Sequence, residues 1–94
     1  MYLILMKNPE MIKTLSDTLR EKRFSGFDVS EIRHARHVME HGPKIRFVVA
    51  ETSEFPKTEM EELIATLRLR GTRTFALRRE RDFERLLEII RSCP

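Results

Sequence analysis

The chain has 94 residues and one cysteine, and its 18 lysines and arginines outnumber 15 acidic residues, giving a net charge of +3. This length indicates a single domain over residues 1–94, and a lone Cys93 excludes an internal disulfide, which is typical of a reducing compartment. The apolar run at the N-terminus is about five residues long, too short for a signal peptide or a membrane span, so we expect a cytoplasmic protein.

The first predicted unit is a strand followed by a helix. Tyr2–Met6 is a short apolar run, and Asn8-Pro9 follows it closely. Asparagine is a preferred helix N-cap and proline suits the first helical position, so we expect a helix to begin there. Its apolar residues recur at helical spacing: Ile12, Leu15 and Leu19. We expect this helix to reach about Arg23 and Ser25-Gly26 to form the turn.

The second unit admits two interpretations. Phe27–Val29 alternates like a strand, and Ser30 could cap a helix that ends at Gly42-Pro43. The apolar side of that helix would hold Ile32, Ala35, Val38 and Met39. The alternative is a longer strand from Phe27 to about Arg33, followed by a loop and a hairpin return. The three- and four-residue spacing favours the helix.

The third and fourth units each pair a strand with a helix. Ile45–Ala50 is almost continuously apolar, as expected of a strand covered on both faces. Thr58 and Glu61 have capping-box spacing, and Gly71 would close the helix that they begin. Thr74–Leu77 is the last predicted strand. Asp82 could cap a final helix with the apolar residues Phe83, Leu86, Leu87 and Ile90.

This alternation predicts an α/β fold of four strand–helix units, with a mostly parallel sheet covered by helices. The alternative is an α+β ferredoxin-like fold, βαββαβ plus a C-terminal helix, which would follow from the strand-and-loop interpretation of the second unit. A parallel sheet collects the residues that follow its strands at one edge, where such folds bind ligands.

The candidate site consists of the residues at those strand ends. Lys7 and Asn8 follow the first strand, Glu51 follows the third, and Arg78 and Arg79 follow the fourth. Lys7 with Arg78 could hold an anion, or either could pair with Glu51. We therefore predict an anion- or partner-binding site composed of these five residues.

Other residues suggest less specific chemistry. His34, His37 and His41 would share one helical face, but no acid or thiol is fixed near them by spacing, so we interpret them as surface residues and expect no metal. Cys93 has no nucleophile-activating partner in the pattern.

Six arginines and one acid lie between Arg68 and Arg81. This stretch could meet nucleic acid, but one tyrosine and no tryptophan offer little stacking surface.

Three stretches resemble the receiver domains of response regulators. They are Leu3–Phe24 (LILMKNPEMIKTLSDTLREKRF), Gly26–Glu40 (GFDVSEIRHARHVME) and Gly71–Ser92 (GTRTFALRRERDFERLLEIIRS). Receivers carry an acidic pair after the first strand, where this chain has Met6 and Lys7. Their phosphorylated aspartate follows the third strand, where this chain has VAET over residues 49–52, and Arg78 replaces their switch Ser or Thr. The resemblance therefore implies a pseudo-receiver without magnesium or aspartyl phosphate that acts through protein contacts.

Two stretches also resemble the PII-like signalling proteins, namely Gly26–Arg33 (GFDVSEIR) and Pro43–Glu51 (PKIRFVVAE). That resemblance implies a ferredoxin-like fold and a trimer with nucleotide bound between subunits. The long mobile loop of that family would be shortened here to His34–Gly42.

We therefore expect a non-enzymatic regulatory module that binds a protein partner. The alternative is a PII-like trimeric regulator that binds a nucleotide or another anionic effector. Homo-oligomerisation is expected to give a dimer, or a trimer in the PII-like case. We expect no resident cofactor, no membrane contact and no nucleic-acid partner.

Overall fold

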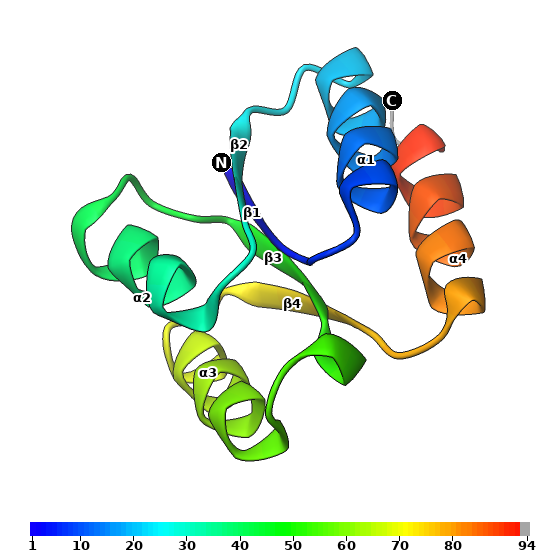
Figure 1. The fold of residues 1–94 in the computed structure, drawn as a ribbon. Coiled ribbons are helices and arrows are strands. Elements are labelled where there is room, and N and C mark those ends of the chain that lie inside the picture. The colour runs from blue at the N-terminus through cyan, green and yellow to red at the C-terminus, as the bar shows by residue number, and fades with distance from the viewer. Residues whose placement is uncertain (93–94) are drawn as a thin grey trace.

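The computed structural model describes residues 1–92 and consists of four consecutive strand–helix units (Figure 1). The elements are β1 (Tyr2–Leu5), α1 (Pro9–Glu21), β2 (Gly26–Val29), α2 (Ile32–His41), β3 (Phe47–Glu51), the short 3-10 helix η1 (Thr52–Glu54), α3 (Lys57–Leu69), β4 (Arg73–Leu77) and α4 (Glu80–Arg91). Cys93 lies outside the described residues.

The four strands form one sheet in the order β2-β1-β3-β4, and every neighbouring pair is parallel. The predicted α/β fold is therefore confirmed. The ferredoxin-like alternative is wrong, because the described strands include no antiparallel pair and the second unit is a strand followed by helix α2. Leu5 lies opposite Val29 on one side and Ala50 on the other, which brings the carboxyl ends of these strands to the same edge.

The helices cover both faces of the sheet, with α1 and α4 on one face and α2 and α3 on the other (Figure 1). Strand β1 lies between β2 and β3, and its side chains alternate between the two faces. Tyr2 and Ile4 pack with α1 and α4, whereas Leu3 and Leu5 pack with α2 and α3. Burial on both faces explains why the first apolar run is continuous rather than alternating.

The face beneath α1 and α4 contains an aromatic row. The ring centroids of Tyr2 and Phe47 are 6.1 Å apart, and Phe47 meets Phe24 and Phe75 edge to face at 5.8 and 6.0 Å. The ring of Tyr2 also lies over Gly26, where an added Cβ atom would come within 2.6 Å of the ring. Glycine is therefore required at the start of β2 by packing against β1.

The starts of the helices differ partly from the sequence prediction. Asn8 caps α1 as expected. Ser30 does not cap α2, which begins two residues later, after Glu31. The predicted capping box of Thr58 is also wrong, because the N-cap position is Pro56 and the helix begins at Lys57, so that Thr58 already lies in its first turn. Asp82 acts from inside α4, because the helix begins at Glu80.

The ends of helices α2 and α3 agree with the prediction. Helix α2 ends at His41 and is followed by Gly42-Pro43, and Gly71 follows α3 with a φ of +73° that favours glycine. The strands differ by one or two residues, most clearly β3, which begins at Phe47 rather than Ile45. Within residues 1–92, no helix is long and apolar enough to cross a membrane.

Candidate functional site

The five predicted site residues lie along the carboxyl edge of the sheet, but their side chains serve different purposes. Lys7 follows β1, Glu51 ends β3, and Arg78 follows β4, whose Leu77 is in register with Glu51. The structure therefore brings their backbone positions to one edge. No ion pair joins Glu51 to Lys7 or Arg78 within the described part of the chain.

Asn8 is engaged at the start of α1. Its side-chain oxygen accepts hydrogen bonds from the backbone N–H groups of Glu10, at 3.0 Å, and Met11, at 3.3 Å. The next N–H group, of Ile12, donates to the Asn8 carbonyl at 3.0 Å, and Pro9 has no N–H. The whole first turn of α1 is thereby satisfied, and Asn8 has a structural role.

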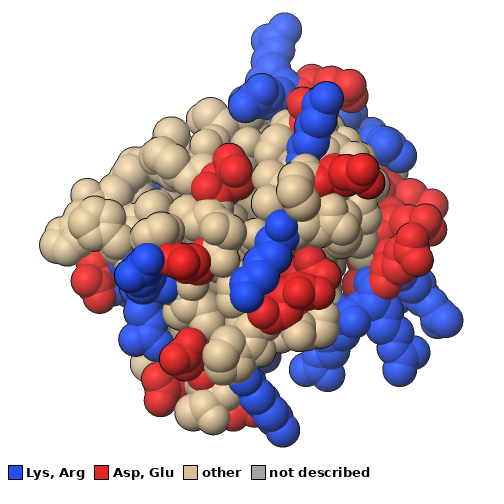
Figure 2. All heavy atoms as spheres, viewed as in Figure 1, with Lys and Arg blue, Asp and Glu red and all other residues tan. Residues whose placement is uncertain are grey.

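Arg78 and Arg79 use their backbones at the start of α4. Their N–H groups donate to Oδ2 of Asp82 at 3.0 and 3.1 Å, and these hydrogen bonds hold the pKa of Asp82 below its usual value. The side chains of both arginines are exposed. Figure 2 shows Lys and Arg side chains gathered at the lower right, beside the start of α4, while charges of both signs alternate over the rest of this face.

Glu51 is partly buried, and one of its carboxylate oxygens, Oε2, is inaccessible and has no hydrogen-bond partner among residues 1–92. Burial raises the pKa of Glu51, and the nearby charge of Glu54 raises it further. This carboxylate destabilises the fold when it is ionised, and its protonation relieves that cost.

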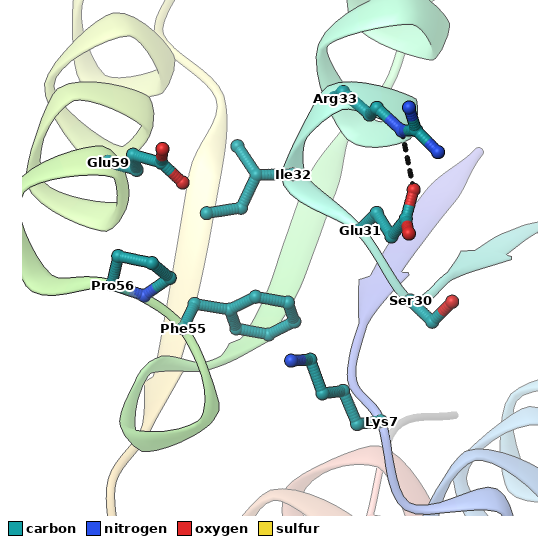
Figure 3. A pocket seen from close by; sticks show the side chains of 8 residues that line it. All are labelled: Lys7, Ser30, Glu31, Ile32, Arg33, Phe55, Pro56 and Glu59. Carbon is teal, nitrogen blue, oxygen red and sulfur yellow. Dashed lines mark hydrogen bonds and ion pairs between the residues drawn. The ribbon is translucent and has the colours of Figure 1, made fainter.

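Lys7 lies in an open groove at the carboxyl edge (Figure 3). The groove has a volume of about 540 Å³, and its other lining residues are Ser30, Glu31, Ile32, Arg33, Phe55, Pro56 and Glu59. The ammonium group of Lys7 is 5.1 Å from the centroid of the Phe55 ring, a cation–π contact. Ile32 and Phe55 supply an apolar floor, while charged side chains stand around it (Figure 3).

The other charges of the groove are partly neutralised. Arg33 Nε lies 2.6 Å from Glu31 Oε2, and this hydrogen bond, with the charge of Arg33, lowers the pKa of Glu31. His34 lies 3.6 Å from the same oxygen. Lys7, in contrast, takes part in no ion pair within residues 1–92. The charge of Lys7 nevertheless contributes to the lowered pKa of Glu31, so an incoming anionic group would share Lys7 with Glu31.

Two helix starts meet at this groove. Residues 30–33 lead into α2, and Pro56 leads into α3. Neither start is capped by a side chain at its N-cap position, which is Glu31 in α2 and Pro56 in α3. The first intrahelical bonds are donated by Ala35 and Met60, so the preceding N–H groups have no partner in the described part of the chain and carry partial positive charge.

Most of the groove was not among the predicted site residues. Ser30 was assigned to a helix cap, and Phe55 lies in a short polar loop that carries no periodic signal. The order of the strands was the missing information, because it brings the segments after β1, β2 and β3 together. The end of β2 could have been included, since it belongs to the same parallel sheet.

The three histidines lie on α2 and are exposed, as the sequence analysis proposed. The rings of His37 and His41 are 4.8 Å apart. Among residues 1–92, no group of three or more His, Cys, Asp or Glu side chains could hold a metal ion.

Comparison with protein-family models, with curated proteins and with solved structures finds no match for this chain.

Proposed function

We propose that this protein is a non-enzymatic regulatory module of the pseudo-receiver type, which binds an acidic segment of a protein partner at the groove around Lys7. The observation that carries this proposal is the Lys7 ammonium, which forms no ion pair within residues 1–92 and lies in an open groove between two uncapped helix starts. A carboxylate placed there would meet one full positive charge and the partial charges of the helix starts.

The position of the groove supports a binding role. In open α/β sheets, ligands bind outside the carboxyl ends of the strands where the strand order reverses. Here the chain passes from β1 outward to β2 and then returns across β1 to β3. Lys7 follows β1, Ser30 follows β2 and Phe55 follows β3, so the groove is formed at this reversal.

The shape of the groove favours a protein segment over an enclosed small molecule. Its residues come from three separate connections, and Glu31, Arg33 and Glu59 are exposed on its rim. Apolar contact on Phe55 and Ile32 would accompany the charge contact at Lys7. Such a mixture of an apolar centre and a polar rim is typical of protein interfaces.

The all-parallel sheet also bears on the choice between the two resemblances. It agrees with the receiver resemblance, whereas the PII-like alternative calls for a ferredoxin-like fold. The sequence departures at Met6, Lys7 and Glu51 argue for a module that is not phosphorylated.

Site-specific photo-crosslinking in a lysate of the source organism tests this proposal. A benzophenone side chain is introduced at Arg33, on the groove rim, or at Glu84, an exposed residue of α4 that serves as the control. We expect a discrete adduct from position 33 that disappears in the Lys7→Glu variant, and none from position 84. An adduct from position 84 alone, or one indifferent to Lys7→Glu, would contradict the proposal.

Light scattering with and without adenine nucleotides distinguishes the alternative function. The proposed module should keep its mass when nucleotide is added. A trimer that is stabilised by nucleotide would instead favour a nucleotide-binding regulator that resembles the PII-like proteins in assembly but not in fold.

A further inference from the structure

We propose that the open edge of β4 binds an extended peptide segment with acidic residues, which adds a fifth strand to the sheet. This surface is separate from the groove around Lys7, and the inference does not depend on the proposed function. It rests on the backbone of β4, on a hollow at the carboxyl end of that strand and on the charges at its two ends.

The backbone of β4 offers hydrogen-bonding groups to an added strand. Strand β4 is the last in the sheet order and, within residues 1–92, pairs with β3 alone. The N–H of Arg73 donates to the carbonyl of Arg46 at 3.4 Å, toward β3. Since the direction alternates along a strand, the N–H and C=O groups of Thr74 and Ala76 point outward. Such unpaired edges are templates for further pairing.

Small side chains allow another chain to approach this edge. Thr74 and Ala76 are in register with Val48 and Ala50, which pack toward α2 and α3, and Ala76 is exposed. Past the carboxyl end of β4, between α3 and Arg78, is a hollow of about 460 Å³. It is lined by Thr52, Lys57, Met60, Glu61, Ile64 and Arg78. An apolar side chain of the added strand can fill the space against Met60 and Ile64.

The charges at the ends of β4 select an acidic occupant. Arg73 begins the strand, and Arg78 and Arg79 follow it, and all three side chains are exposed. The acidic residues nearby are Glu61, in the hollow, the partly buried Glu51, the exposed Glu80 and Asp82, which is engaged by backbone N–H groups, so the three arginines outnumber the exposed acids near the ends of the strand. An extended segment with an acidic residue at each end would therefore be attracted to Arg73 at one end and to Arg78 and Arg79 at the other.

A second copy of this chain fits the edge less well. Antiparallel pairing of two β4 strands would place Arg73, Arg78 and Arg79 of both copies along one seam. Like charges facing each other across a strand pair are destabilising. The other edge strand, β2, is shorter and has the exposed carboxylate of Asp28 within it, which disfavours an acidic segment there.

The test uses the peptide Glu-Val-Thr-Val-Thr-Val-Glu and its counterpart with lysine at both ends, each titrated into the full chain and followed by amide NMR. We expect the glutamate peptide to bind at least about tenfold more tightly, because several exposed charge contacts of up to about 1 kcal/mol each change sign. Hydrogen exchange should slow at the amides of Thr74 and Ala76. Equal affinity for the two peptides, or protection at Asp28 instead, would overturn the proposal.

Two kinds of variant complete the test. Ala76→Pro removes an outward N–H and should abolish binding, whereas Asp28→Pro removes the corresponding group of β2 and should leave binding intact. Because proline can unfold a strand, the double variant Arg73→Glu/Arg78→Glu provides a second measurement on exposed side chains. It should reverse the preference in favour of the lysine peptide. An unchanged preference, or a dimer formed through β4, would contradict the inference.

Discussion

The start of α1 and the starts of α2 and α3 lie along the same edge of the sheet but are completed in different ways. In α1, Pro9 lacks an N–H and Asn8 accepts the next three, so the turn is satisfied internally. In α2 and α3 the N-cap residues are Glu31 and Pro56, and neither caps its helix with a side chain. The open N–H groups of both helices lie around the groove with Lys7.

Packing differs between the two ends of the strands. At the amino ends of β1 and β2, the Tyr2 ring lies so close over Gly26 that no Cβ atom fits between them. At the carboxyl ends, the connections into α2 and α3 leave a groove of about 540 Å³. The tightly packed end stabilises the fold, whereas the open end with unsatisfied donors is suited to binding. The comparison teaches that a polar residue after a strand is a candidate ligand only when the neighbouring helix start does not use it.

The largest loss of stability is expected from a substitution at Gly26, where β2 packs tightly against Tyr2. Gly26→Ala places a methyl group against Tyr2, and we expect it to cost about 2–3 kcal/mol, lowering the melting temperature by roughly 10 °C or more. Ser30→Ala, on the groove rim, should change stability by less than about 0.5 kcal/mol. Thermal unfolding of both variants by circular dichroism makes the comparison. Equal melting temperatures would show that the two ends of the strands do not differ in packing.

A smaller effect is expected from the helix caps. Asn8→Ala leaves two N–H groups of α1 unsatisfied and should cost about 1 kcal/mol. Thr58→Ala, in the first turn of α3, should cost less than about 0.5 kcal/mol, because no side chain caps that helix. Urea unfolding measures both free energies. If Thr58→Ala lowered the free energy of unfolding as much as Asn8→Ala, the conclusion that a side chain caps α1 but not α3 would be contradicted.

The smallest effect concerns Glu51. Its raised pKa means that ionisation costs stability in the folded state, so Glu51→Gln should raise the melting temperature at pH 7 by a few degrees. Below the folded pKa the wild-type carboxyl is protonated, so the advantage should shrink as the pH falls toward 4.5, its ordinary value. Melting curves of Glu51→Gln and the wild type between pH 7 and pH 4.5 test whether the variant is the more stable protein and whether its advantage shrinks.

Asp82 is the counterpart of Glu51, because its pKa is shifted in the opposite direction and its ionised form stabilises the fold. The backbone N–H groups of Arg78 and Arg79 lower the pKa of Asp82. The stability that ionised Asp82 contributes is therefore fully present above the ordinary pKa of 3.8 and is lost as the pH falls through the pKa of the folded state. Asp82→Asn should therefore destabilise the protein at pH 7 and have no effect at strongly acidic pH. If both variants shift stability in the same direction at pH 7, the electrostatic account of this edge is wrong.

The sequence predicted the order of elements because each apolar run is followed by a helical stripe. Residues after Leu5 and Glu51 could be assigned to one edge, since parallel strands end together. The prediction failed at Ser30 and Thr58, where a capping pattern was present but the backbone began its helix elsewhere. It did not find Phe55, because the partner of a loop residue depends on strand order, which periodicity does not encode.

The most direct test of the groove uses glutarate, a small dicarboxylate that imitates an acidic side chain, titrated against the amide spectrum. We expect saturable shifts at Arg33 and Thr58, in the uncapped first turns of α2 and α3, and none at Glu10 and Met11 of capped α1. Lys7→Met should abolish these shifts. Shifts of equal size at α1, or shifts that persist without the Lys7 ammonium, would contradict the account that this groove is an acidic-segment binding site.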